Sequence, residues 1–308
     1  MFEVAKLAES FLVLKSPVNV GVILKGDEAV LIDTGSSPDH AKRIARVLGE
    51  LAVKKVSIIN THSHADHIGG NSFLQSKYKS RIFATKLESA FIENPVLEPA
   101  YLWGALPFKG IDNKFLLAKP SVVTDIIDYG TNEELNVNII PLPGHSFDMI
   151  GILTNLPDKR IFFVADSIVS SQTIQKYKVY FLVDVAQHLK TLDSLKLWVE
   201  NDVSFIVPSH GEVYNLESDE SKEEFLKLVE SNKNVVKETL NTIIDYLDVP
   251  RTIDDVVSHV AEKFFLSLDA TGYVLLLQTL KAYCNYLFEN DYAQIIFENR
   301  RLEYVRKQ

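Results

Sequence analysis

Four side chains that can bind a metal ion stand within six residues of this chain, in the segment Thr61-His62-Ser63-His64-Ala65-Asp66-His67. A short apolar strand, predicted over residues 56–60, leads directly into this segment. Small residues separate the candidate ligands, and Gly69-Gly70 allow the backbone to pass close to them before the next helix. Because a purely structural use of so dense a cluster is rare, the segment predicts a metal site at the end of a strand.

Three further candidate ligands follow other predicted strands and turns. His145 follows a turn that contains proline and glycine, and Asp166 and His210 follow apolar strands. Since ligands of α/β sheets gather outside the carboxyl ends of the strands, we expect these side chains to converge on the first segment. Imidazole and carboxylate groups suit zinc and related iron or manganese sites. Four ligands would suffice for one structural metal, whereas these seven are enough for two.

The other three histidines of the eight stand alone in the sequence. An isolated histidine is more often a structural or surface residue than a metal ligand. We therefore expect structural roles for His40, His188 and His259.

The chain alternates between β-rich and helical stretches. A helix is predicted over 38–51, where apolar residues recur at helical spacing. Such alternation indicates a layered α/β domain. Apolar runs bounded by turn residues predict strands over 18–24, 29–33, 56–60, 81–84, 137–142, 150–154, 160–165 and 205–208.

The segment from about 87 to 121 departs from this alternation. It is rich in proline and aromatic residues and has no clean period. A long excursion of this kind is usually a functional lid or a disordered linker, and its aromatic content favours packed structure. Its aromatic residues, together with a tyrosine that lies shortly after His210, either form an apolar substrate pocket or simply pack the excursion against the fold. These candidates are Tyr101, Trp103, Phe108 and Tyr214.

The pattern becomes helical after His210. A long charged helix is predicted over 218–247, a capped helix begins near Thr252, and a third helix covers about 272–290. Two short β-like pieces at 292–297 and 302–305 close the chain across Glu298-Asn299-Arg300-Arg301. Helices followed by a hairpin indicate a small unit that resembles a winged helix.

Composition limits the partners and the compartment. The 308 residues carry a net charge of −9, which disfavours nucleic acid as a partner. The single cysteine, Cys284, excludes an internal disulfide and fits a reducing compartment. From the early acidic residue and the lack of a long apolar run, we expect neither a signal peptide nor a membrane span, which requires roughly 20 apolar residues. We therefore expect a cytoplasmic protein without membrane contact.

Several motifs together resemble those of a known superfamily. Over roughly residues 10 to 215, the sequence resembles the metallo-β-lactamase-fold hydrolases, and its helical tail is similar to the glyoxalase II and lactamase-like group. The resemblance implies a four-layer αβ/βα sandwich at 1–215 and a helical, winged-helix-like domain at 216–308. The matching motifs are Ile32-Asp33-Thr34-Gly35, His62-Ser63-His64-Ala65-Asp66-His67, Pro143-Gly144-His145-Ser146, Ala165-Asp166-Ser167 and Ser209-His210-Gly211.

The resemblance also implies a ligand assignment for two divalent metal ions. Zinc is preferred, with iron or manganese as alternatives. Asp166 would bridge the two ions, and Asp33 would lie behind the site as a hydrogen-bond partner. The first ion would be bound by His62, His64 and His145, and the second by Asp66, His67 and His210.

A site of this kind needs no protein nucleophile. Two metal ions lower the pKa of a bridging water toward about 7 and so supply hydroxide. Asp66 is the natural group to orient that water and hold its proton. Three serines beside the ligands are better interpreted as small turn residues than as nucleophiles: Ser63, Ser146 and Ser209.

Hydrolysis of a small ester-type substrate fits these features best, either a thioester of the hydroxyacylglutathione type or a lactone. Lys176 and Lys178 are candidates for contacts with glutathione. A phosphodiesterase or ribonuclease with the same metals is an alternative. The support for this alternative in the sequence is limited to four basic residues near the end, Arg300, Arg301, Arg306 and Lys307.

Two further alternatives remain open. One is an iron-dependent enzyme similar to the sulfur dioxygenases, and the other is a regulatory binding protein, which would not need all seven ligands. No flavodoxin-like half follows residue 215, which argues against the flavodiiron oxygen reductases. The apolar run Val274-Leu275-Leu276-Leu277 also offers a surface for a homodimer.

Overall fold

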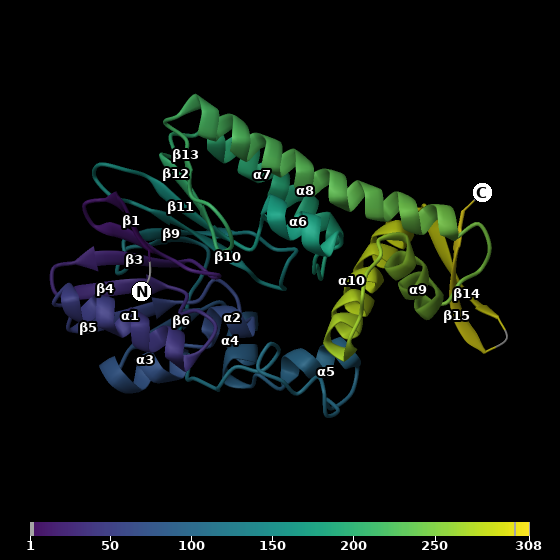
Figure 1. Cartoon of the computed structure of the whole chain (residues 1–308), viewed down its shortest axis with the longest axis horizontal. Helices are drawn as coiled ribbons and strands as arrows, with labels where there is room; N and C mark the ends of the chain where they lie inside the picture. Colours follow the sequence, from purple (N-terminus) through teal and green to yellow (C-terminus); the bar gives the residue numbers. More distant parts are fainter. Residues whose placement is uncertain (1–2, 299, 308) are drawn as a thin grey trace.

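Two β-sheets form the centre of the fold in the computed structural model, which describes residues 3–298 and 300–307. The first sheet has the order β1-β2-β3-β4-β5-β6-β7, antiparallel from β1 to β4 and parallel from β4 to β7. Figure 1 shows this sheet beside the second one. Its strands are Glu3–Ala8, Phe11–Lys15, Val20–Lys25, Glu28–Ile32, Lys55–Ile59, Arg81–Ala84 and Asp125–Ile126.

The second sheet has the order β13-β12-β11-β10-β9-β8. Only β11 and β12 pair in parallel. In chain order, β8 to β13 are Gly130–Asn132, Val137–Pro141, Ile150–Thr154, Ile161–Ala165, Phe205–Pro208 and Tyr214–Asn215.

The alternation of side chains along the strands explains how the sheets stack. Successive residues of a strand point to opposite faces. In β11, Ile161 and Phe163 pack into the core shared with the first sheet, whereas Phe162 and Val164 pack against the outer helices. Both faces of this strand are therefore buried.

Helices cover the outer face of each sheet (Figure 1). The helices α1 (Pro38–Glu50) and α3 (Asn71–Tyr78) pack on the first sheet, and α7 (Val185–Val199) packs on the second. The first half of α8 (Asp219–Tyr246) also packs on the second sheet. Helix, sheet, sheet and helix thus form the expected four-layer αβ/βα sandwich.

The excursion after residue 86 is packed structure. It contains α4 (Lys86–Glu93) and α5 (Leu97–Trp103), and Leu102 of α5 is buried against Val274 of α10. The sequence-based expectation of packed structure is confirmed here, although the two short helices had no periodic signature.

The C-terminal part contains two helices and a hairpin, as predicted. Helix α9 (Ile253–Lys263) begins at Thr252, α10 covers Ala270–Glu289, and β14 (Ala293–Glu298) pairs with β15 (Arg301–Arg306). Asn299, in the predicted hairpin turn, lies outside the described residues. Within residues 3–298 and 300–307, no helix is long and apolar enough to cross a membrane.

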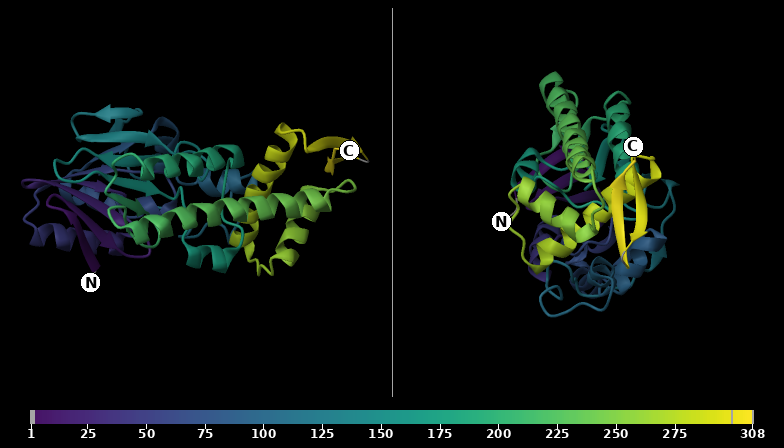
Figure 2. Two further views of the ribbon diagram at one scale, coloured as in Figure 1. Left: turned by 90° about the horizontal axis from the view of Figure 1, so that it is seen from above. Right: turned by 90° about the vertical axis from the view of Figure 1, so that its right-hand side faces the viewer.

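Helix α8 connects the sandwich with the C-terminal helices, as the left view in Figure 2 shows. Its first half buries Phe225 and Val229 on the second sheet, and its second half buries Val236 and Ile243 against α9 and α10. Because one helix serves both packing clusters, the domain boundary at 215/216 stays a prediction. The remaining helices are α2 (Ala65–Ile68) and α6 (Ser171–Tyr177).

Candidate metal centre

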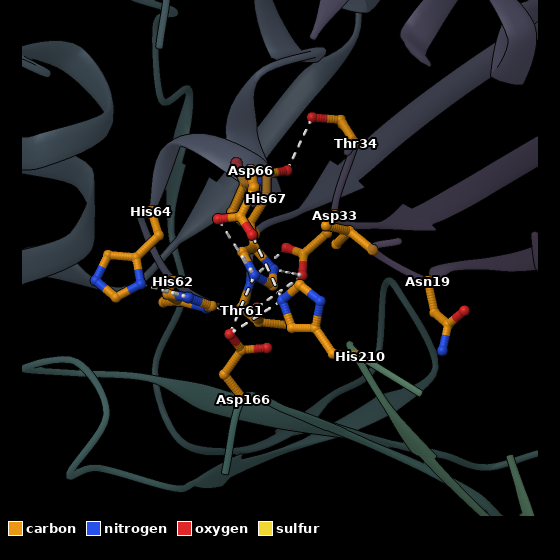
Figure 3. Close-up of polar contacts among 12 residues, drawn as sticks. Asn19, Asp33, Thr34, Thr61, His62, His64, Asp66, His67, Asp166 and His210 are labelled. Carbon is orange, nitrogen blue, oxygen red and sulfur yellow. Dashed lines mark hydrogen bonds and ion pairs between the residues drawn. The ribbon is translucent and has the colours of Figure 1, made fainter. Parts of the chain in front are cut away.

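The seven candidate ligands converge at the ends of strands between the two sheets. Figure 3 labels all of them except His145. His62 and His64 lie between β5 and α2, and Asp66 and His67 lie in α2 itself. The other candidates follow β9, β11 and β12 along the chain. They are His145, Asp166 and His210.

Three imidazoles form a first cluster. His62 Nε2 lies 3.1 Å from His64 Nδ1, and His145 Nε2 lies 3.0 Å from the same His64 atom. Three nitrogens this close present their lone pairs to one point, which is the donor set of a divalent metal.

A second cluster combines two imidazoles with a carboxylate. His210 Nε2 lies 3.4 Å from Asp66 Oδ2, and His67 Nε2 lies 3.8 Å from Asp66 Oδ1. As in the first cluster, the candidate ligand atoms lie within 4.8 Å of one another.

Asp166 lies between the two clusters. Its Oδ2 atom is 3.4 Å from His145 Nε2 in the first cluster. The same atom is 3.4 Å from both His67 Nε2 and His210 Nε2 in the second. A carboxylate in this position can serve two metal ions at once.

The opposite nitrogen of four histidines is held by the protein. His67 Nδ1 lies 2.9 Å from Asp33 Oδ2, and His62 Nδ1 lies 3.0 Å from Thr61 Oγ1. Backbone carbonyl oxygens hold the other two: that of Phe181 lies 3.1 Å from His145 Nδ1, and that of Pro17 lies 2.6 Å from His210 Nδ1. Such contacts fix the ring orientation and leave Nε2 free to bind a metal.

Asp33 contacts His67 on the side away from the other candidate ligand atoms. Its carboxylate also accepts hydrogen bonds from the backbone nitrogen and the hydroxyl of Thr61, each at 2.8 Å. Its backbone has a φ of 62°, in the left-handed region that few non-glycine residues adopt. Ala165, directly before Asp166, has a φ of 51°. Strained backbone at both positions is typical of functional sites.

Two buried atoms at the centre support the presence of a metal. His67 Nε2 and Asp166 Oδ1 are buried without a hydrogen-bond partner among the described residues. A buried polar group without a partner is costly, and coordination to a metal would satisfy it. Neutral imidazole nitrogens and carboxylate oxygens also match the ligands that zinc, iron and manganese accept.

The electrostatics differ between the two clusters. Burial lowers the pKa of His62 and His145, and it lowers that of His64 to about 3, so these rings stay neutral. Burial opposes protonation of His67 and His210 as well, but neighbouring carboxylates together outweigh it: Asp166, Asp66 and Asp33 around His67, and Asp166 and Asp66 beside His210. The pKa of His67 is therefore well above its usual value, and that of His210 is raised to about 10. The carboxylates thus make the second cluster the one that favours a bound positive charge, either a proton or a metal ion.

Two glycines beside the candidate ligands lie against the backbone of neighbouring segments. A Cβ on Gly69 would lie 2.4 Å from the Ser36 carbonyl carbon, so the close passage here is to the start of α1 and not, as the sequence had suggested, to the ligands. Gly144, directly before His145, has a φ of 129°, and a Cβ there would lie 2.5 Å from the backbone of His188. Neither position accepts a larger residue without a shift of the chain.

The aromatic pocket candidates occupy different surroundings. Tyr101 contacts Phe91 and Phe147, with ring centres 5.7 and 5.4 Å apart. Trp103 and Phe108 pack edge to face on each other at 5.1 Å, and both are exposed.

Tyr214, at the edge of the second sheet, packs on Phe225 of α8 at 5.2 Å. The two lysines considered for glutathione lie at the exposed end of α6. They are Lys176 and Lys178. The pocket and lysine roles stay predictions.

The structure adds residues that the sequence alone did not single out. The ring of Phe181 lies 5.5 Å from that of His64, and its carbonyl oxygen is the one that holds His145. The Asn19 amide donates to the carbonyl oxygens of Pro208 and Gly211, on either side of His210. Only tertiary structure brings these residues to the site, so no local pattern could indicate them.

A buried carboxylate, Glu88 of α4, also contacts the ligand loops. Sequence reasoning overlooked this residue as well.

The three isolated histidines lie outside both clusters. His188 is buried beside Tyr180, whose hydroxyl is 3.0 Å from His188 Nε2, and His259 stacks on Tyr246 at 3.9 Å. His40 is buried at the start of α1, with its Nε2 atom 3.1 Å from Ser16 Oγ. These surroundings agree with the expected structural roles.

Comparison with known proteins identifies similar sequences. The sequence profile described as the metallo-beta-lactamase superfamily matches residues 14–210. A hydroxyacylglutathione hydrolase from Nitrobacter hamburgensis is 28% identical over 152 residues, which cover 49% of this chain and 49% of that protein. A probable metallo-hydrolase from Bacillus subtilis is 35% identical over 81 residues, 26% of this chain and 35% of that protein. The chain thus spans half or less of the length of these curated relatives.

Solved structures share the fold over nearly the whole chain. A metallo-beta-lactamase family protein from Thermus thermophilus has a TM-score of 0.73 at 18% identity and covers 98% of this chain and 100% of its own. A beta-lactamase domain protein from Burkholderia ambifaria has a TM-score of 0.70 at 14% identity, over 99% of this chain and 94% of its own. At these identities, the likeness shows the fold, including the C-terminal helices.

Proposed function

This chain belongs to the metallo-beta-lactamase superfamily, and from that premise we propose that it is a hydrolase that uses two divalent metal ions. The observation that supports this most strongly is the position of Asp166 Oδ2, 3.4 Å from imidazole nitrogens of both clusters. We propose zinc as the metal, because histidine nitrogens dominate the donor set, with iron or manganese as alternatives. The ligands would be those that the family resemblance implies, three histidines for one ion and Asp66, His67 and His210 for the other.

Two bound metal ions would supply hydroxide at neutral pH and polarise the oxygen of the scissile group. Within the chain, Asp66 is the group that holds the proton of the attacking water. Its side chain is 42% exposed, whereas that of Asp166 is 12% exposed, so Asp66 can exchange protons with solvent. His210, 3.4 Å away, orients its carboxylate.

The proposed reaction is hydrolysis of a thioester or a lactone. The water oxygen forms a bond to the carbonyl carbon, and the bond from that carbon to sulfur or to the ring oxygen breaks. The leaving thiolate or alkoxide then takes up the proton that Asp66 holds. No serine hydroxyl takes part in this scheme.

Aromatic side chains near the first cluster support an ester with an apolar part. Phe181 lies 5.5 Å from His64 and 5.8 Å from His145, measured between ring centres. Phe147 follows His145 by two residues and stacks with Phe91 at 5.7 Å. Apolar walls with a few polar groups are typical of small-molecule sites. We propose a cytoplasmic location as well, which the single buried cysteine, Cys284, supports.

The test is a substrate panel with the zinc-loaded protein: a hydroxyacyl thioester of glutathione, an acyl lactone and a phosphodiester. We expect turnover of the thioester or the lactone, and we expect His64→Ala and Asp166→Ala to abolish it. His259→Ala, in α9 and outside both clusters, is the matched control and keeps the activity. Exclusive turnover of the phosphodiester, or turnover that survives Asp166→Ala, would overturn the proposal.

A further inference from the structure

The start of helix α4 carries a sequence pattern that the structure uses in an unexpected way. Thr85-Lys86-Leu87-Glu88 fits the capping box, in which the first and fourth residues satisfy the backbone of the helix start. Thr85 is indeed the N-cap residue, but among the described residues its side chain makes no capping hydrogen bond. Its hydroxyl donates instead to the Asp148 carbonyl oxygen at 3.1 Å. The polar groups of this helix start are therefore directed to other parts of the fold.

The Glu88 carboxylate contacts both loops that carry the ligands of the first cluster. Its Oε2 atom accepts a hydrogen bond from the backbone nitrogen of Ser63, between His62 and His64, at 2.9 Å. Its Oε1 atom accepts from the Ser146 hydroxyl at 2.5 Å and from the Asp148 backbone nitrogen at 3.0 Å. Ser146 directly follows His145. One side chain thus connects two loops that are more than 80 residues apart in the sequence. Its contacts in these loops are adjacent to three candidate ligands, His62, His64 and His145.

Glu88 is also fully enclosed by the protein, with 1% of its surface exposed. A buried carboxylate is costly unless several donors satisfy it. Here two backbone nitrogens and one hydroxyl do so, and hydrogen bonds to a charged acceptor are among the stronger ones in proteins. A buried carboxylate that accepts hydrogen bonds from both loops therefore fixes the distance between them.

We propose that Glu88 is a positioning residue that sets the separation of the His62–His64 loop from the His145 loop and thereby the affinity of the first metal position. It touches neither substrate nor metal and acts through Ser63, Ser146 and Asp148. Among the described residues its hydrogen bonds go to Ser63, Ser146 and Asp148 and not to the Asp66, His67 and His210 cluster, so its effect is selective for one of the two ions. This inference rests on the proposed two-metal site.

The isosteric change Glu88→Gln is the sharpest test. An amide has one acceptor oxygen instead of two, so its NH₂ group must face either the Ser63 nitrogen or the Ser146 and Asp148 donors. Either orientation loses at least one hydrogen bond to a ligand loop without changing the volume of the side chain. Glu93→Gln is the matched control, because Glu93 lies on the same helix and accepts from the Val123 backbone nitrogen, away from the ligand loops.

The measurement is zinc affinity of the full chain by chelator competition, resolved into two binding steps, with thermal unfolding of the metal-free protein alongside. We expect Glu88→Gln to weaken one step by about 10–100-fold and to leave the other step unchanged, as for other residues that orient metal ligands. Glu93→Gln leaves both steps unchanged. Ser146→Ala, which removes one of the three donors, weakens the same step less, and its effect is not additive with that of Glu88→Gln.

The outcomes separate this inference from the proposed function. If the unaltered protein binds fewer than two zinc ions, the proposed function fails. If it binds two, and Glu88→Gln lowers only the unfolding temperature or weakens both steps equally, the positioning role is wrong while the two-metal site stands.

Discussion

Individual side chains at the metal centre are held from two sides, and this explains which of them the sequence revealed. The ligands of the first motif follow one another along the chain, so their spacing alone predicted a metal site. Phe181 and Glu88 reach the same centre from distant segments, and each contacts a ligand loop through atoms that carry no local signature. Glu88 was further concealed because its local pattern predicts a helix cap.

Another residue with a measurable effect is His188, buried in α7. Burial lowers its pKa from 6.5 to about 3, and its Nδ1 atom has no hydrogen-bond partner among the described residues. The unfolded chain takes up a proton near pH 6.5, whereas the folded chain does not, so the unfolded state binds more protons between these two values. The free energy of unfolding therefore decreases as the pH falls from about 6.5 toward 3. The decrease approaches about 1.4 kcal/mol for each pH unit once His188 is protonated in the unfolded chain and neutral in the folded one.

We predict that His188→Gln flattens this pH dependence. Glutamine does not titrate, and its side-chain NH₂ group can donate to the Tyr180 oxygen, which lies 3.0 Å from His188 Nε2 and whose own proton goes to the Asn232 carbonyl oxygen. The measurement is the free energy of urea unfolding at pH 7.0 and pH 5.5 for both proteins. The difference between the two pH values is expected to shrink by about 1.2 kcal/mol in the variant. An unchanged difference would show that His188 does not titrate as described.

At the level of helices and strands, the ends of elements were the most predictable features. Helix α1 begins after Ser37, whose side chain accepts from the His40 nitrogen, and α8 begins after Ser218 in the same manner. The predicted starts, residues 38 and 218, agree with the structure to within one residue, the second from the acidic residues after Ser218 and the first from the apolar spacing that follows a turn. The helices α4 and α5 have 8 and 7 residues, too few for a periodic pattern to stand out. Their positions depend on tertiary packing, which local sequence does not encode.

The capping box of α9 gives a prediction at this level. Thr252 and Asp255 satisfy each other's backbone nitrogens, and α9 packs with α8 and α10 in the C-terminal cluster. Thr252→Ala removes one cap and is expected to lower the free energy of unfolding by about 1 kcal/mol. Urea denaturation should show a lower midpoint with an unchanged slope. Thr242→Ala, which removes an exposed hydroxyl within α8, is the control and should leave the midpoint in place.

Across the whole molecule, the alternation of strands and helices predicted a layered α/β domain, whereas the four-layer arrangement was implied by the family resemblance. Strands buried on both faces, such as β10 and β11, agree with that arrangement. The contact between α5 and α10 was not predictable, because it joins Leu102 with Val274 across most of the chain. The run around Val274, considered as a dimer surface, buries Val274 itself inside the monomer.

The central claim is that this fold brings seven ligands together for two metal ions. Asp166 carries the most weight in that claim, because its Oδ2 atom is 3.4 Å from nitrogens of both clusters. The most direct test is the metal content of the zinc-equilibrated protein, measured by elemental analysis after removal of free metal. Two zinc ions per chain are expected, and Asp166→Ala should retain fewer than one while keeping its helical content. A full-length, folded protein that retains no metal, or an Asp166→Ala variant that still binds two ions, would contradict the account.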